Sequence, residues 1–354
     1  MSGGSLVSIV VLALAATFIA PVPITAQATQ GAATKKAEAK SWTAPLTPDG
    51  HPDLQGNWVN RSATPLERPK QLEGRESLTD AEVAELKSRA DRLFKNGYSD
   101  MPAGDDLFLA ALANVDKYKR ASSTADSAIM LEREFDHRTS LIVDPPDGKL
   151  PPYTPGGQQR QRAFVAAQSK QFPPATTRDL TNLERCITWG VPLPRAGPDT
   201  SYYQIVQSPG YVVIVMEAIH DARIIPVSGP RDGRRHLPPG MRTWNGDSIG
   251  RWEGQTLVVD TSNFSEKSNF LGSAENLHLV EHFTRVAPNE IRYEITVEDP
   301  ATWIKPWTAV LRLKQTQDRI YEYACHEGNF EEMQDMLLGG RAQENAAKEA
   351  AGKR

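Results

Sequence analysis

The chain has 354 residues, of which 39% are hydrophobic and 24% are charged, and it contains two cysteines. A chain of this length and composition can build one or two globular domains whose core needs no metal to hold it together. The formal net charge of −4 is spread along the sequence without a basic stripe, which argues against a nucleic-acid partner.

An apolar segment at residues 6–20 is followed by two prolines and by Ala26-Gln27-Ala28. An apolar core that ends in a small-x-small sequence is typical of a secretory signal, so residues 1–28 are predicted to be removed and the protein to be periplasmic or secreted. The alternative is a short membrane anchor, although a spanning helix needs roughly 20 apolar residues. We expect no integral membrane span after cleavage, because no later segment is long and apolar enough.

Residues 29–44 are predicted to be a flexible leader, because they are rich in small and charged residues. Residues 45–185 are predicted to form a helix-containing region that packs on a β domain. Near its start, Gly56-Asn57-Trp58 resembles the Gly-x-Trp opening of lipocalin-like barrels, where a first-strand Trp packs across the barrel base. Within this region we expect a strand at residues 139–144 and helices at 77–97, 105–118 and 158–170.

The first of these helices has a capping sequence at its amino end. Ser77 and Asp80 are spaced to satisfy the free backbone N–H groups of the first turn. Asn96-Gly97 supplies the stop signal at the other end.

From about residue 186 the hydrophobic period changes to two, and turn sequences recur every 8–12 residues or so. Residues 186–330 are therefore predicted to form an antiparallel β-barrel or sandwich, so the chain as a whole is mainly β with amino-terminal helices, an α+β fold. Residues 331–354, Ala-rich and charged, are expected to be a solvated helix or a frayed tail. The expected strands lie at 202–207, 211–217, 223–227, in a hairpin at 249–261, at 277–286 paired with 290–298, and at 307–313 paired with 319–325.

The β region carries a run of motifs with a recognisable pattern. The motifs are Gly246-Asp247-Ser248-Ile249-Gly250-Arg251-Trp252-Glu253-Gly254-Gln255-Thr256-Leu257-Val258-Val259-Asp260-Thr261, then Leu277-His278-Leu279-Val280-Glu281-His282-Phe283, then Asp299-Pro300 and Pro306-Trp307. Over residues 220–329 this pattern resembles an uncharacterised family of exported bacterial proteins. The resemblance implies an exported location and a β fold, which we suspect to be lipocalin-like, and it implies no reaction.

The chain departs from that family pattern at two positions. Asp247 stands where His is frequent, and Gln255 stands where Asp is frequent. If a His at the first position has a chemical role in the family, this chain has changed or lost it.

Cys186 and Cys325 would meet an oxidising environment in an exported protein, which favours a disulfide. It would close a loop of about 140 residues. The alternative is a pair of buried thiols that act as small apolar residues. A catalytic thiol beside His326 is disfavoured, because adjacent residues of a strand point to opposite faces.

Several polar residues are expected at strand ends and turns of one region, which makes them candidates for a site in a concave apolar shell. The structural alternative for each is a solvated turn, a local ion pair or a turn cap. The candidate catalytic residues are His220, Asp247, His278, Glu281 and His326.

Acids beside indoles are typical of carbohydrate sites, because the ring stacks on C–H faces while the carboxylate binds hydroxyls. The alternative is that Trp303 and Trp307 fill the core and that Glu253 lies at a hairpin tip. The candidate ligand-binding residues are Arg223, Trp252, Glu253, Asp299 and Trp307.

Two matches to enzyme motifs are disfavoured by their context. The H-x-x-E-H string at residues 278–282 requires a helix, whereas on a strand its imidazoles lie roughly 13 Å apart, too far for one zinc ion. The G-x-S-x-G string at residues 246–250 requires a helix after Ser248, and a strand is expected there. We therefore expect no metal site and no cofactor.

These features favour an exported β-barrel that binds a small molecule, either a carbohydrate or another organic compound, with hydrolase or lyase chemistry as an open option. The alternative is a non-catalytic periplasmic interaction or structural module. A pocket lined by polar groups would favour the first hypothesis, and a filled barrel with exposed apolar patches would favour the second. Metal-assisted catalysis would require three ligands that converge within about 5 Å.

Overall fold

The computed structural model describes residues 42–94, 106–114, 133–170, 174, 176–192, 201–229 and 235–352. The expected signal segment lies outside these residues, as do most of the expected leader and the carboxyl ends of the first two expected helices, residues 95–97 and 115–118. The described residues all belong to one compact unit.

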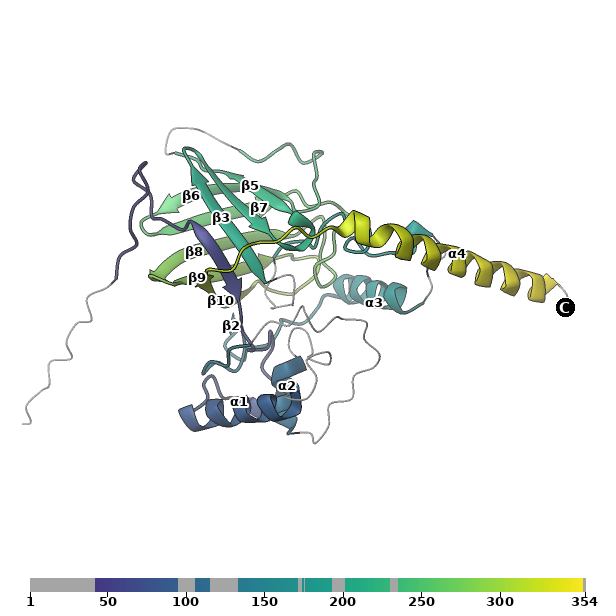
Figure 1. Cartoon of the computed structure of the whole chain (residues 1–354), viewed down its shortest axis with the longest axis horizontal. Helices are drawn as coiled ribbons and strands as arrows, with labels where there is room; N and C mark the ends of the chain where they lie inside the picture. Colours follow the sequence, from purple (N-terminus) through teal and green to yellow (C-terminus); the bar gives the residue numbers. More distant parts are fainter. Residues whose placement is uncertain are drawn as a thin grey trace, which may run out of the picture. The chain divides into compact units, whose positions relative to one another are not determined.

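A 10-stranded antiparallel sheet dominates the structure, with the strand order β5-β4-β3-β1-β10-β9-β8-β7-β6 and with β2 paired to β10 outside this order. Its two end strands, β5 and β6, approach each other (Figure 1). A parallel bridge joins Val227, which follows β5, to Gly250 of β6. The sheet is thus a nearly closed barrel, and the mainly β fold expected from the sequence is confirmed. The strands are β1 (Gly56–Asn60), β2 (Ile142–Asp144), β3 (Tyr202–Ser208), β4 (Tyr211–Met216), β5 (Ala222–Pro226), β6 (Asp247–Glu253), β7 (Thr256–Ser262), β8 (His278–Ala287), β9 (Glu290–Glu298) and β10 (Trp307–Thr316).

The alternation of residue types along each strand decides which side chains enter the barrel. On β8, Leu279, Glu281 and Phe283 are buried while the residues between them are half-buried. The register places Phe283 opposite Tyr293 of β9, and the two rings stack with their centroids 4.4 Å apart. Strand β8 is therefore extended, as the sequence predicted, and its histidines at 278 and 282 share the outer face.

Trp58 of β1 is completely buried in the barrel core. Its indole N–H donates to the carbonyl of Leu54 at 2.8 Å, and the Arg285 guanidinium lies 5.4 Å from the ring centroid. Because β1 pairs with both β3 and β10, the sheet extends beyond residues 186–330. The sequence had indicated a β domain confined to those residues. The amino-terminal region thus contributes a central strand to the sheet rather than only packing on it.

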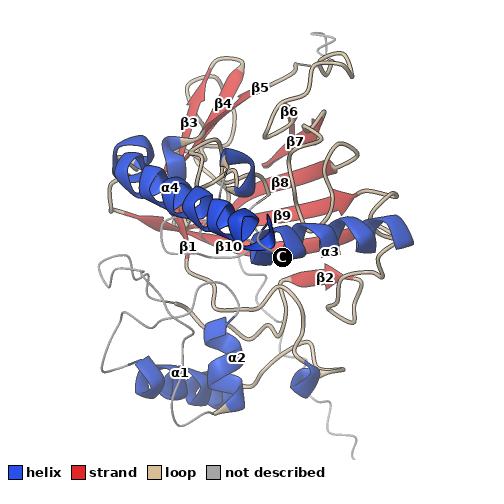
Figure 2. Ribbon diagram, turned by 90° about the vertical axis from the view of Figure 1, so that its right-hand side faces the viewer, coloured by secondary structure: helices blue, strands red, loops and turns tan. Residues whose placement is uncertain are grey.

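The helices are α1 (Asp80–Phe94), α2 (Asp106–Ala113), α3 (Pro155–Lys170) and α4 (Cys325–Gly352). Helices α1 and α2 lie against each other and bury a small second core (Figure 2). The cap of α1 differs from the expected one, because Thr79 and Glu82 form it instead of Ser77 and Asp80. The Thr79 N–H donates to the Glu82 carboxylate at 2.8 Å, and the Glu82 N–H donates to Thr79 Oγ1 at 3.3 Å.

Helix α3 is fixed to the turn between β9 and β10. The Thr154 hydroxyl donates to the carbonyl of Ala301 at 2.6 Å. Gly157 approaches so closely that a Cβ atom there would lie 2.4 Å from the carbonyl oxygen of Thr302. This contact sets the position of Phe164, which belongs to the wall of a cleft described below.

The prediction of a strand at residues 319–325 is wrong. Residues 317–324 have no regular structure, and α4 begins at Cys325, earlier than the expected tail boundary at 331. Strand β10 is already paired to β1 and β9 on its two edges, so it has no edge left for a return strand. The solvated-helix alternative for the tail is the one observed, since most described side chains beyond residue 338 are exposed.

Candidate functional site

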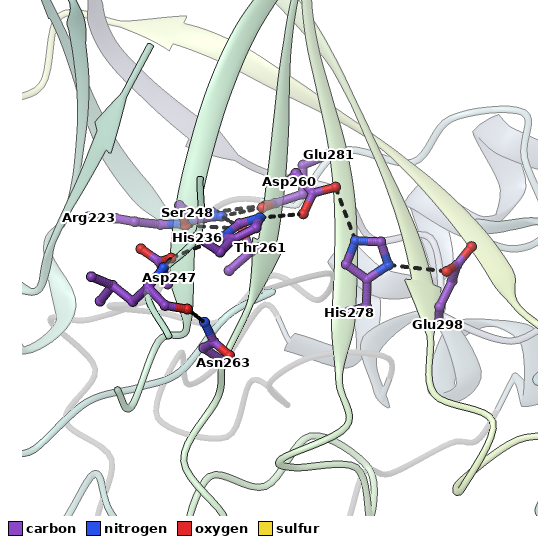
Figure 3. Close-up of polar contacts among 11 residues, drawn as sticks. Arg223, His236, Asp247, Ser248, Asp260, Thr261, Asn263, His278, Glu281 and Glu298 are labelled. Carbon is purple, nitrogen blue, oxygen red and sulfur yellow. Dashed lines mark hydrogen bonds and ion pairs between the residues drawn. The ribbon is translucent and has the colours of Figure 1, made fainter. Parts of the chain in front are cut away.

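An ion pair lies inside the barrel, between Arg223 of β5 and Glu281 of β8. Arg223 Nη1 donates to Glu281 Oε1 at 3.0 Å, and Nη2 donates to Oε2. The remaining guanidinium donors reach Ser248 Oγ at 3.0 Å and Thr261 Oγ1 at 2.6 Å, and the Tyr293 hydroxyl donates to Glu281 Oε1 at 2.5 Å. All of these residues are buried, and Figure 3 shows Arg223, Ser248, Thr261 and Glu281.

This interior ion pair ties the two ends of the sheet together. Burial lowers the pKa of Arg223, but the charge and hydrogen bonds of Glu281 raise it above its ordinary value, so the guanidinium stays charged. Burial and the neighbouring Glu281 raise the pKa of Tyr293 well above its ordinary value, so the phenol remains a donor. Since β5 and β6 are the end strands, contacts from β5 to β6, β7 and β8 close the barrel across its seam.

The barrel interior is largely filled by side chains. The cavity beside the interior ion pair measures about 30 Å³. A water molecule needs roughly 10–15 Å³ by this measure, so the cavity has room for one or two waters and no larger ligand. It is lined by Val191, Tyr203, Ile205, Ile214, Met216, Arg223, Phe283, Tyr293 and Leu313.

A row of alternating acids and histidines crosses the outer face of β6 to β9, and we call it the acid–histidine row. His236 Nδ1 lies 3.0 Å from Asp247 Oδ2, and His236 Nε2 lies 2.8 Å from Asp260 Oδ1. The other oxygen of Asp260 lies 3.1 Å from His278 Nε2, and His278 Nδ1 lies 3.1 Å from Glu298 Oε2. Figure 3 shows these side chains following one another from strand to strand.

The row holds His278 as a cation at neutral pH. Its hydrogen bond with Asp260 and the weaker one with Glu298 raise the pKa of His278 to about 9, against the opposing effect of partial burial. Partial burial raises the pKa of Asp260, but the hydrogen bonds from His278 and His236 lower it overall. An imidazole that is already protonated cannot serve as a general base at neutral pH.

The row also fastens the loop at residues 235–246 to the sheet. The Leu237 N–H donates to Asp247 Oδ2 at 2.6 Å, and the Asn263 amide donates to the Leu237 carbonyl at 2.8 Å. Within the described ranges, no three His, Cys, Asp or Glu side chains come together as metal ligands. The arrangement thus braces this loop and the four strands through contacts between carboxylates and imidazoles.

A cleft of about 620 Å³ opens near the barrel end at which β6 and β8 begin, and we call it the mouth cleft. Ligand sites typically measure roughly 300–1,000 Å³ and combine aromatic walls with a few polar groups. The aromatic wall residues are Phe164, Trp189, Trp244, Phe264 and Phe270, and the polar ones include Asn182, Arg185, Glu266, Lys267 and Asn269.

Covalent and polar links hold the wall formed by residues 179–191. The disulfide between Cys186 and Cys325, with a Cα–Cα distance of 5.8 Å, joins it to the start of α4. Asp221 accepts a hydrogen bond from Thr188 at 2.5 Å and another from Asn245 at 2.7 Å, which links the wall to the residue after Trp244. The disulfide expected from the sequence is therefore present, and the alternative of two free thiols is excluded.

The candidate residues named from the sequence fall in separate places. Asp247 and His278 belong to the acid–histidine row, whereas Glu281 and Arg223 form the interior ion pair. Strand alternation places the first two outside the barrel and the other two inside it. None of the four lines the mouth cleft.

His220 and His326 do not join these groups. His220 is exposed at a turn in which its own φ is +41°. His326 is exposed on the first turn of α4, because residues 319–325 do not form the strand that would have carried it to the rim. Neither imidazole has a hydrogen-bond partner among the described residues.

Trp252 and Glu253 lie at the far end of β6 from the mouth cleft. The Trp252 ring stacks on His51 at 5.2 Å and lines a smaller cleft of about 410 Å³. Glu253 accepts a hydrogen bond from Arg251 at the exposed hairpin tip. This is the position that the sequence analysis gave as the alternative to a ligand-binding role.

Asp299 and Trp307 are structural in their surroundings. Asp299 is buried and accepts hydrogen bonds at 2.6 Å from the hydroxyls of both Ser273 and Thr302. Trp307 is 1% exposed and packs edge-to-face on Trp303 at 5.8 Å, so neither indole offers a free face.

No protein-family model matches the sequence, and no curated protein matches it either. The barrel fold and its clefts are compatible with ligand binding. Among the described helices, none has the length and apolar character needed to cross a membrane.

Sequence reasoning missed several residues that the structure brings forward. Asp260 had a usable signal, because it is a charged residue on an otherwise apolar strand and so must face outward or be paired. His236 lies in a polar loop, and Arg185 and Trp189 lie in a segment without periodicity. For these three the sequence offers no comparable signal, because Asp247 lies 11 residues from His236 and the cleft lined by Arg185 and Trp189 is formed by segments that are distant along the chain.

Proposed function

We propose that the protein binds a small organic molecule in the mouth cleft, at the end of the barrel rather than inside it. The observation that carries this proposal is a cleft of about 620 Å³ whose wall includes Trp189 and Trp244. Indole faces stack on planar rings and on the C–H faces of sugars. The barrel interior has room for water alone, so it does not compete for such a ligand.

Binding is favoured over hydrolase or lyase chemistry by the residues of the cleft. Its lining contains no histidine, and its carboxylates are Asp179 and Glu266. The Asp179 carboxylate already accepts hydrogen bonds from the N–H and the hydroxyl of Thr176, at 2.8 and 2.9 Å. A paired general acid and base within reach of one ligand is therefore missing from the described wall.

The proposal is tested by a thermal-shift screen of sugars and aromatic compounds against the wild type, Trp189→Ala and Trp42→Ala. Trp189 is 36% exposed and Trp42 is 37% exposed, so the two substitutions remove similar side chains from similar environments. Compounds that stabilise the wild type should also stabilise Trp42→Ala and should lose their effect on Trp189→Ala. Compounds that raise the melting temperature of both variants equally would show that the ligand binds outside the mouth cleft. A screen in which no compound stabilises the wild type would favour a non-catalytic interaction module.

We also propose that the protein is exported to the periplasm or the medium, as its family resemblance implies. The signal-like residues 6–28 support this, and so does the Cys186–Cys325 disulfide, because disulfides persist in oxidising compartments. Amino-terminal sequencing of the protein from fractionated cells should find Thr29 first. A cytoplasmic protein that retains residues 1–28 would contradict the proposal.

A further inference from the structure

We infer that the ligand of the mouth cleft is a ring-bearing carboxylic acid and that Arg185 receives its carboxylate. This inference rests on the proposed function. It adds the chemical class of the ligand and the residue that selects it.

Arg185 has an incomplete set of partners. Its Nη2 donates to Asn182 Oδ1 at 2.7 Å, while its Nε is buried and has no hydrogen-bond partner. A buried donor that lacks an acceptor is energetically unfavourable. Because Nε is closed to solvent, a ligand carboxylate would bind the Nη atoms, and no carboxylate of the described residues pairs with them.

The acids near Arg185 along the chain are already engaged. Glu184 accepts the N–H of Thr181 at 2.7 Å, and Asp179 accepts both donors of Thr176. These are local caps that leave the guanidinium free of a counter-charge. Arginine is permanently protonated, so Arg185 contributes a fixed positive charge to a wall that also carries Lys267, Asp179 and Glu266.

A carboxylate fits this group better than a phosphate does. The guanidinium binds a planar carboxylate through two parallel N–H donors, which gives direction as well as energy. Glu266 adds negative charge to the wall, and this disfavours a doubly charged group. The indoles of Trp189 and Trp244 supply faces for the ring of the same molecule.

The backbone around Arg185 is held in place. Its N–H donates to the Thr181 carbonyl at 3.1 Å, and the next residue, Cys186, is bonded to Cys325. Asn329 of α4 donates to the carbonyl of Glu184 at 2.9 Å. A guanidinium fixed in this way loses little conformational entropy when a ligand binds.

The inference is tested by calorimetric titration with matched acid and neutral probes. The pairs are indoleacetate with indoleacetamide, and galacturonate with galactose. The wild type should bind the acid of at least one pair about tenfold more tightly than its neutral partner, as expected for a charge-assisted bond. In Arg185→Gln this preference should disappear while the affinity for the neutral partner stays within about twofold.

Lys305→Gln is the control, because it removes an exposed positive charge that does not line the mouth cleft. It should retain most of the acid preference, and circular dichroism should confirm that both variants are folded. If the wild type binds acid and neutral probes with equal affinity and Trp189→Ala binds neither, the ligand need not be a carboxylic acid. The mouth cleft would then still be the binding site. Binding of none of the probes, or an acid preference that survives in Arg185→Gln, would also overturn the inference.

Discussion

Glu281 shows how much a single position contributes to this barrel. It is completely buried, and its oxygens accept hydrogen bonds from Arg223 and Tyr293. Loss of one partner from a buried ion pair leaves the other charge without compensation, which is far more costly than loss of an exposed pair.

We predict that Glu281→Gln lowers the free energy of unfolding by about 3–5 kcal/mol, because Arg223 would remain charged in the barrel interior. Glu253→Gln, at the exposed hairpin tip, should change it by less than about 0.5 kcal/mol. Urea denaturation of both variants measures the difference. Similar small effects in the two would mean that the interior ion pair does not hold the seam.

At the same scale, the sequence indicated the residues of this ion pair but not their role. The strand pattern of β8 places Glu281 on the same face as Leu279 and Phe283, which is a signal for a buried acid. Its partner Arg223 lies 58 residues away, on the opposite end strand of the sheet. Pairing over that separation depends on barrel closure, which no local pattern reveals.

At the scale of elements, the acid–histidine row joins β6 to β9 and makes their stability depend on pH. The pKa of His278 is about 9 in the folded protein and 6.5 ordinarily. Its contribution to folding is therefore complete below pH 6.5 and is lost as the pH rises through 9. The lowered pKa of Asp260 acts in the acid range and does not affect this window.

We predict that the melting temperature of the wild type declines between about pH 6.5 and 9 more steeply than that of His278→Asn. His220→Asn is the control, because that imidazole is exposed and should leave the wild-type slope unchanged. Thermal melts across this range measure the slopes. If the melting temperatures of the wild type and His278→Asn fall in parallel with pH, the acid–histidine row is not a source of the pH dependence.

The disulfide is the second feature at this scale, since it joins the wall of the mouth cleft to α4. Its cysteines are separated by 139 residues. In the chain-entropy view, a closed loop of this length stabilises the fold by up to roughly 5 kcal/mol.

We predict that the double variant Cys186→Ser, Cys325→Ser loses up to roughly 5 kcal/mol of unfolding free energy and binds cleft ligands more weakly. Urea denaturation and the thermal-shift assay measure the two effects. Wild-type affinity in a destabilised variant would show that the wall keeps its shape without the bond.

The elements themselves were predicted unevenly. Strands with clear alternation, such as β8 and β9, were found within a residue or so, whereas residues 319–325 were wrongly assigned to a strand. That segment resembles a strand in composition, but the edges of β10 are occupied by β1 and β9. Competition for a sheet edge is a property of the whole fold, so the local sequence could not decide it.

At the scale of the whole molecule, the chain is a nearly closed barrel that has its amino-terminal strand in the middle of the sheet and is largely filled by its own side chains. From strand spacing the sequence predicted an antiparallel barrel or sandwich, and the Gly-x-Trp resemblance at Trp58 pointed to a lipocalin-like barrel. It did not predict that the polar residues would separate into an interior pair and an outer row. That separation follows from the period of two, which sends neighbours such as Asp260 and Thr261 to opposite faces.

The proposed ligand site is the mouth cleft and not the barrel interior. Crystals soaked with para-iodobenzoate test it directly, because the iodine atom marks its own position by anomalous scattering. Binding in the mouth cleft would give one strong anomalous peak between Trp244 and Arg185. A peak inside the barrel beside Tyr203 and Met216, or in the smaller cleft beside Trp252, would contradict it.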